Sequence, residues 1–231
     1  MAYPSDVRNL NFVAFLGPMP ATRFKRKRAH ATILNALMSS PVNSAIAGLS
    51  ASEASKREAA AEEIYRLGRA TAGSAISTWW TDSELSALLL APNPAVTVGL
   101  AVARETFSPI RIANGTPRLA EVPAEQDAEE FELHFANDVS LDILTTREPG
   151  GNGAIARFLS KHGEGVQQVE FRCSNVDRAT AILKEKFRLA PVYPEARPGA
   201  DGTRVNFFLV ASPDGGKVLI ELYEAAAEPR K

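Results

Sequence analysis

The chain has 231 residues and a formal net charge of −1, and apolar residues make up 45% of it. This composition is typical of a globular protein, and it excludes both wholesale disorder and a global field that would select nucleic acid or an anionic membrane. The one cysteine, Cys173, excludes an internal disulfide and a cysteine-rich zinc site. No apolar run has the length of a transmembrane helix, and residues 1–17 lack the basic segment that opens a signal peptide. We therefore expect a cytoplasmic protein.

The first 93 residues are rich in Ala and Ser, and their pattern is mainly helical. We predict that they form an N-terminal region separate from residues 94–231. A short strand is expected over residues 10–16 and a helix over residues 28–38. The basic cluster at residues 23–28 is short and has one aromatic residue, so a solvated helix start explains it better than nucleic-acid binding.

Two further helices are expected before the strand-rich part of the chain begins. Their start signals are capping boxes, formed by Ser50 with Glu53 and by Thr81 with Glu84. The first helix is predicted over residues 51–67, and the second stops before Pro92. Trp79 and Trp80 lie between the two helices and are expected to anchor the packing.

From residue 96 onward the chain repeats one order of elements, strand–helix–strand–strand–strand. In the first round the elements are expected at residues 96–102, 104–114, 118–122, 129–135 and 139–145. In the second round they are expected at residues 166–173, 176–187, 190–193, 204–211 and 217–223. A glycine-rich turn at residues 150–153 and a helix over residues 154–161 connect the two rounds. The pattern predicts an internal duplication, with modules at about residues 96–148 and 164–225.

The strands alternate apolar and polar residues, which predicts two different faces of the sheet. The face expected to lie under helices carries Val98, Leu100, Val102, Phe131, Leu133, Phe135, Val169, Phe171, Cys173, Val205, Phe207 and Leu209. The opposite face carries Thr97, Gly99, Ala101, Glu130, Glu132, His134, Asp142, Gln168, Glu170, Arg172, Arg204, Asn206 and Glu221. A face this polar is wet. It is either a solvated sheet surface or a cup that holds a polar ligand, and the pattern fits both.

Several segments of the second round resemble methylmalonyl-CoA epimerases, which belong to the vicinal-oxygen-chelate (glyoxalase, bleomycin resistance, dioxygenase) superfamily. They are AIARFLSKHGEG at residues 154–165, VQQVEF at 166–171, NVDRA at 175–179, RPGADGTRV at 197–205 and VLIEL at 218–222. Upstream, VGLAV at residues 98–102 and EQDA at 125–128 resemble the same family. The resemblance implies an α+β fold in which paired βαβββ modules form a cup-shaped mixed sheet. It gives no family for the mainly helical residues 1–93.

The resemblance also implies a divalent metal site, but this chain departs from its pattern. The family binds its metal through two histidines, a Gln or Glu, and a Glu. These positions fall on Thr97, Asp142, Gln168 and Glu221, so the resemblance leaves Asp142, Gln168 and Glu221 as metal ligands and replaces both imidazoles. Imidazole suits Co, Ni, Zn and Fe, whereas oxygen ligands suit hard ions, so the metal site is expected to be altered or absent. A shifted site made of Glu132, His134 and Glu170 is the alternative.

The same resemblance implies proton-transfer chemistry. In the family, two carboxylates exchange the proton beside a thioester carbonyl, and the catalytic carboxylates fall on Glu125 and Glu221. Without a metal, Arg172 or Arg204 would have to stabilise the enolate. The expected protein is an isomerase or lyase of the epimerase or glyoxalase type that binds a small carbonyl or acyl-CoA-type ligand. The alternative is a non-catalytic small-molecule-binding protein, and by analogy with the family either form is expected to pair as a homodimer.

Overall fold

The computed structural model describes residues 42–89 and 96–226. The chain divides into two compact units, residues 1–39 and 40–231, and the second unit contains all the described residues. The strand expected at residues 10–16, the helix expected at 28–38 and the basic cluster at 23–28 lie outside the described residues.

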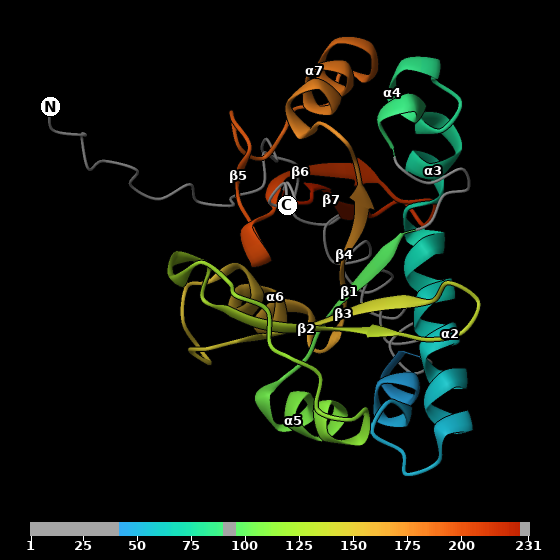
Figure 1. Cartoon of the computed structure of the whole chain (residues 1–231), viewed down its shortest axis with the longest axis vertical. Coiled ribbons are helices and arrows are strands. Elements are labelled where there is room, and N and C mark those ends of the chain that lie inside the picture. The colour runs from blue at the N-terminus through green and yellow to red at the C-terminus, as the bar shows by residue number, and fades with distance from the viewer. Residues whose placement is uncertain (1–41, 90–95, 227–231) are drawn as a thin grey trace, which may run out of the picture. The chain divides into compact units, whose positions relative to one another are not determined.

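The described part contains a curved, seven-stranded mixed sheet with the strand order β2-β3-β1-β4-β7-β6-β5 (Figure 1). The strands are β1 (Thr97–Ala101), β2 (Ala128–His134), β3 (Ser140–Thr146), β4 (Gly165–Arg172), β5 (Arg197–Pro198), β6 (Arg204–Ala211) and β7 (Lys217–Glu224). Strand β1 pairs in parallel with β3, and β4 pairs in parallel with β7. One helix follows the first strand of each pair: α5 (Arg104–Ala113) follows β1, and α7 (Val176–Phe187) follows β4. An antiparallel pairing of β1 with β4 joins the modules at the centre of the sheet. The predicted fold class, α+β with paired modules in a mixed sheet, is confirmed.

The remaining helices precede or connect the modules. They are α2 (Ala54–Thr71), α3 (Gly73–Trp79), α4 (Ser83–Leu88) and α6 (Ala154–His162), together with a helical segment at residues 42–48. Both predicted capping boxes are wrong. Helix α2 begins after Glu53 without a side-chain cap, whereas Asp82 caps α4 by accepting from the backbone N–H groups of Glu84 and Leu85. An aspartate carboxylate one residue later competes successfully with the Thr81 hydroxyl because it is the stronger acceptor.

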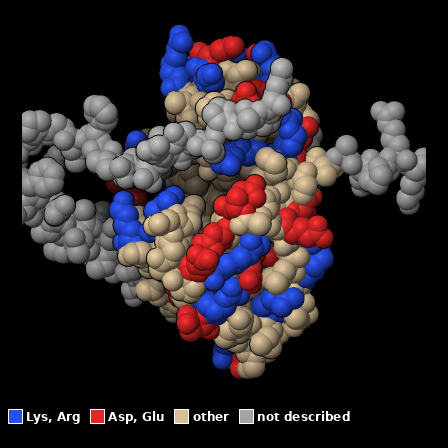
Figure 2. Space-filling view, turned by 90° about the vertical axis from the view of Figure 1, so that its left-hand side faces the viewer, with Lys and Arg blue, Asp and Glu red and all other residues tan. Residues whose placement is uncertain are grey.

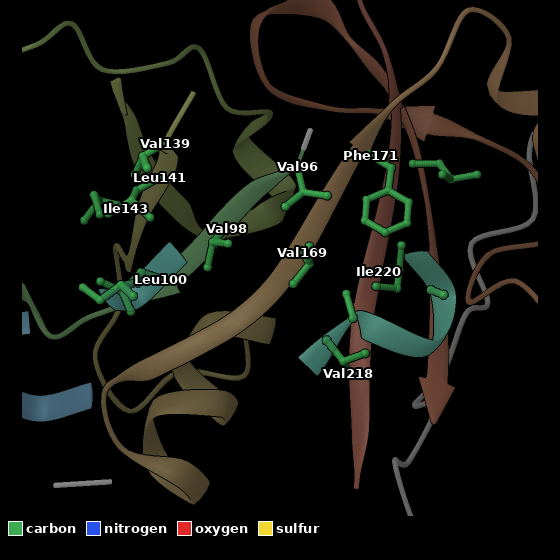
Figure 3. Packing of buried hydrophobic residues seen from close by; sticks show 14 of the residues in the cluster. Val96, Val98, Leu100, Val139, Leu141, Ile143, Val169, Phe171, Val218 and Ile220 are labelled. Atoms are coloured by element: carbon green, nitrogen blue, oxygen red, sulfur yellow. The ribbon is translucent and has the colours of Figure 1, made fainter. Parts of the chain in front are cut away.

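The main core lies between the helices and one face of the sheet (Figure 3). Val98, Leu100, Val169 and Phe171 are fully buried there, as expected. Trp79 is 1% exposed in the same core, and its ring meets Phe171 edge-on with the centroids 5.3 Å apart.

The helices before the sheet supply part of this core. Ile64 and Leu85, from α2 and α4, are fully buried in the cluster that contains the strand residues. The main core is therefore built by the helices before residue 90 together with the strands. A division of the chain at residue 93 into an N-terminal region and a vicinal-oxygen-chelate domain stays a prediction. Within the described ranges, no helix is both long and apolar enough to cross a membrane.

Two short predicted strands differ in the structure. Residues 118–122 are extended coil, tied to β2 by the bond from the Ala120 N–H to the Glu130 carbonyl. Residues 190–193 form only an isolated bridge, at Pro191, and the strand β5 lies further on. Pro191 removes one backbone donor from the second segment, which limits its ladder.

The predicted faces of β6 are reversed. Asn206 and Phe208 pair with Leu222 and Ile220, which lie in the core, so these two residues face the helices. Phe207 instead pairs with Glu221 and faces the cup. Residues 205–210 are apolar at all positions but one. The alternation of apolar and polar residues therefore does not decide which face of β6 packs against the helices.

Candidate functional site

The concave face of the sheet gathers acidic side chains from four strands, β2 and β3 on one side of β1, and β4 and β7 on the other. In register across the sheet, Glu132 pairs with Asp142, and Glu170 pairs with Glu221. Asp142 and Gln168 both pair with Gly99 of the central strand β1. Residues paired in register share a face, so these side chains point to the same side. We call Asp142, Gln168, Glu170 and Glu221 the acidic floor.

One amide joins two carboxyls of the acidic floor. Gln168 Nε2 donates to Glu221 Oε2 over 2.6 Å and to Glu170 Oε1 over 3.1 Å. Asp142 and Glu170 are 5% and 7% exposed, so both are almost completely shielded from water. Among the described residues, Asp142 Oδ1 finds no hydrogen-bond partner although it is buried. A buried, unpaired carboxyl oxygen is costly, and it indicates a place for a ligand donor or a proton.

Gly99 makes room for this arrangement. A Cβ at this position would lie 2.5 Å from Gln168 Cγ and 3.2 Å from Glu170 Oε1. Any larger residue in the centre of the sheet would therefore push the Gln168 side chain away from Glu221. Glycine at position 99 is explained by this close approach, since its φ is not positive.

Burial and mutual repulsion raise the pKa of the acidic floor. Burial raises the pKa of Glu170 to about 8, and the neighbouring carboxylates add to this, while hydrogen bonds with Gln168 and Asp142 oppose it. Burial, reinforced by nearby carboxylates, holds the pKa of Asp142 and of Glu221 well above the usual range. The same two causes raise the pKa of Glu130, on the same face, to about 7. Glu130 and Glu170 can therefore hold and release protons near neutral pH.

Glu125, the second predicted catalytic carboxylate, lies in a different setting. It is exposed, in the short 3-10 turn η1 (Ala124–Gln126) that leads into β2. The adjacent Gln126 donates through Nε2 to the Pro198 carbonyl over 2.7 Å. This bond ties the turn to strand β5, in the other module. Glu125 thus lies on a segment that connects the modules, and its predicted role stays a prediction.

The structure does not place the two predicted arginines together in the cup. Arg204 lies on the helix side, where it pairs with Asp177 over 2.7 Å, so its expected role at the enolate is wrong. The β6 register explains this, because Arg204 pairs with Glu224 and shares its face. Arg172 lies opposite Tyr223 at the end of β4 and is exposed.

The shifted metal site is not formed either. His134 contacts Glu132 over 3.0 Å and Ser140 over 3.1 Å, at the exposed edge of the face. Among the described residues, no group of three or more His, Cys, Asp or Glu side chains is positioned to hold a metal ion. At the family's metal positions, the Gln168 amide nitrogen points at the carboxylates, and a threonine replaces the first imidazole. The residues present do not fit a transition metal of the family type.

We expect the purified protein to carry no stoichiometric Co, Ni or Zn, because imidazole ligands are missing from the acidic floor. The double variant Thr97→His, Gln168→His should gain affinity for these ions, since both positions lie on the cup face, on the adjacent strands β1 and β4. Elemental analysis and a metal titration of both proteins measure this. A near-stoichiometric transition metal in the unchanged protein would contradict the alignment.

The paired modules, with a polar cup on the concave face of a mixed sheet, define the architecture that the sequence resemblance implies. Solved structures to which the chain is similar include methylmalonyl-CoA epimerase from Mycobacterium tuberculosis, which is 29% identical over 57% of this chain and 87% of that chain, with a TM-score of 0.47. A variant of the Streptomyces coelicolor enzyme, solved with 2-nitronate-propionyl-CoA, is 26% identical over 57% and 96% of the two chains, with a TM-score of 0.46. No protein-family model matches this chain, and no curated protein matches it. These solved structures thus carry the name of the family that the sequence motifs resemble.

Sequence reasoning placed Glu170 and Glu130 on the polar face but gave Glu130 no part in the site. Burial in the folded sheet raises the pKa of both carboxyls, and this makes them candidates for proton transfer. One signal in the sequence could have indicated this. Acidic residues at matching positions of paired strands predict a carboxyl cluster once the register is known.

Proposed function

We propose that the cup binds a small carbonyl or acyl-CoA-type ligand and that Glu221 transfers a proton at the carbon beside the carbonyl. The observation that carries this is the buried Glu221 carboxyl, held by Gln168 beside Asp142 and Glu170. A carboxyl with a raised pKa is an efficient general base or acid near neutral pH. The sequence resemblance around residues 154–223 supports the choice of ligand.

The chain's own residues supply the parts of such a reaction. Gln168 fixes the orientation of Glu221, which removes the proton as its carboxylate. The enolate oxygen then needs a donor, and a protonated Asp142 or Glu170 provides one, since a carboxylic acid kept neutral by burial can donate a hydrogen bond. Glu125, on the turn that connects the modules, is the candidate acid that donates its own proton to the opposite face of the carbon, while Glu221 keeps the proton that it removed. No step requires a metal ion.

Replacing Glu221 with glutamine is expected to abolish exchange of the proton beside the carbonyl. Glutamine has nearly the same shape but cannot take the proton, so the rate should fall by at least about 10²-fold. The measurement is deuterium uptake by propionyl-CoA or methylmalonyl-CoA in D₂O, followed by mass spectrometry. Glu58→Gln, an exposed change on α2, is the matched control and should leave the rate unchanged. Equal exchange by the Glu221→Gln variant would exclude the proposed role.

The alternative is a binding protein without turnover. The exposed position of Glu125 and the loss of both family histidines favour it. In that case the unchanged protein binds a thioester without exchanging its proton, and Glu221→Gln changes only the affinity. Cytoplasmic location and pairing into homodimers stay predictions.

A further inference from the structure

The two edges of the curved sheet lie at opposite ends of its strand order, with β2 at one end and β5 at the other. A segment of chain borders each edge. Residues 118–126 lie beside β2, tied to it by the bond from the Ala120 N–H to the Glu130 carbonyl, and residues 197–203 contain β5 and the turn after it. Hydrogen bonds join the two segments directly, so the edges of the two modules meet. We call the two segments the latch.

Asp201 is at the centre of the latch. Its carboxylate accepts two hydrogen bonds from the Arg118 guanidinium, over 2.6 and 2.9 Å, and a third from the Glu121 N–H over 2.9 Å. The Asp201 N–H donates in return to the Glu121 carbonyl over 3.1 Å. At the other end of the latch, Gln126 Nε2 donates to the Pro198 carbonyl over 2.7 Å. All of these bonds run from one module to the other.

The latch is weaker than the central connection between the modules. Figure 2 shows acidic and basic side chains interspersed on one face of the molecule, so an exposed ion pair by itself would not indicate a function. The Arg118 and Asp201 side chains are 68% and 40% exposed, and such a pair contributes little to stability. By contrast, β1 and β4 join the modules through a ladder in which Val98 and Val169 are fully buried. The latch can therefore open while the rest of the sheet stays folded.

The latch also lies against the cup. The Glu130 carbonyl accepts a bond from the latch, and the Glu130 side chain is on the cup face. Burial raises the pKa of Glu130, and the next cause is the Asp201 carboxylate, so Asp201 lies close to this side chain. An open latch would make this wall of the cup accessible from the side.

We propose that the latch is a gate, which opens at the Arg118–Asp201 pair to give access to the cup from the side and closes again over the Glu130 wall. Both segments take part in one opening, because the same set of bonds holds each of them in place. Lids over binding sites are commonly drawn from the least stable parts of a fold. The proposal rests on the proposed function only in taking the cup as the ligand site.

Hydrogen exchange of the full chain, followed by NMR at single amides, tests whether the two segments open together. Asp201→Asn removes the charge but keeps an oxygen acceptor and suits the left-handed backbone at this position, where φ is 50°. We expect the Ala120 amide, which is bonded to Glu130 and not to Asp201, to exchange about threefold to tenfold faster. The matched control is Asp177→Asn, which breaks another exposed ion pair, with Arg204, and should leave this amide unchanged.

Arg118→Gln breaks the same pair from the other segment and provides a second test. It should speed exchange of the Gly199 amide, which is bonded to the Thr203 carbonyl. In both variants the amides of Val98 and Val169 should keep their rates. An effect confined to the substituted segment, or an equal increase at Val98 and Val169, would overturn the gate, because the first is a local change and the second is a general loss of stability.

Thiol labelling tests whether the opening exposes the cup, and it needs no ligand. The native Cys173 is buried, so a cysteine placed by Glu130→Cys is the reactive thiol. It should react with a maleimide more slowly than a cysteine placed by Glu58→Cys on the exposed face of α2. Adding Asp201→Asn should speed labelling at position 130 about threefold to tenfold and leave position 58 unchanged.

Two labelling results would each contradict the gate. They are equal rates at positions 130 and 58 with the latch intact, and a rate at position 130 that Asp201→Asn does not change. Neither the exchange nor the labelling measurement involves a thioester. A failure of the proposed proton transfer would therefore leave the gate standing, and a failure of the gate would leave proton transfer to be judged by its own assay.

Discussion

Replacing Trp79 with alanine is expected to lower the free energy of unfolding by about 3–5 kcal/mol, the usual cost of removing a large buried aromatic side chain. Trp79 is 1% exposed, and its ring packs edge-on against Phe171 and Phe208 of the sheet. Truncation would remove these contacts and leave a cavity between α3 and the sheet. Urea unfolding followed by circular dichroism measures the loss as a lower midpoint.

An exposed apolar side chain provides the control for this variant. Ile112 is 70% exposed on α5, so Ile112→Ala should change the stability by no more than about 0.5 kcal/mol. A loss for Trp79→Ala as small as that for Ile112→Ala would mean that α3 does not pack on the sheet in solution. A large loss would support the finding that the helices before residue 90 complete the core.

The protein is expected to become less stable as the pH rises from about 5 to about 8. The pKa of Glu170 is raised from 4.5 to about 8 in the folded protein, so the folded state holds a proton that the unfolded state has released. Stability from this group is complete below pH 4.5 and is lost as the pH rises through about 8. Each such group contributes a slope of up to about 1.4 kcal/mol per pH unit within this window. Asp142 and Glu221 shift in the same direction and add to the slope.

Glu170→Gln tests the origin of this slope. Glutamine keeps the shape of the protonated acid but cannot ionise, so the variant should lose less stability between pH 5 and pH 8 than the unchanged protein. The exposed Glu58→Gln should keep the full slope. Carboxyls with a lowered pKa, such as Asp201 beside Arg118, make the protein less stable as the pH falls, and this effect is confined to acidic pH. A stability that is constant or rises from pH 5 to pH 8 would contradict the burial of the acidic floor.

The sequence by itself determined the elements of the sheet and much of the cup face. Period-2 alternation in β4 and β7 places Gln168, Glu170 and Glu221 on one face, because the neighbours Val169, Ile220 and Leu222 must be buried. A slip by one residue would bury carboxylates among aliphatic side chains, and this cost fixes the register. The repeat of elements likewise predicted the paired modules.

Only the tertiary structure decided which of these residues form a site. In β6 both faces are apolar, so the choice between Phe207 and Phe208 depends on pairing with β7, which local periodicity does not contain. Glu170 ranked as one polar residue among several until the neighbouring strands buried it beside Asp142 and Glu221. Burial and mutual repulsion depend on residues far apart in the chain. A sequence pattern therefore gives the face on which a carboxyl lies, while the packed sheet decides its pKa and its partners.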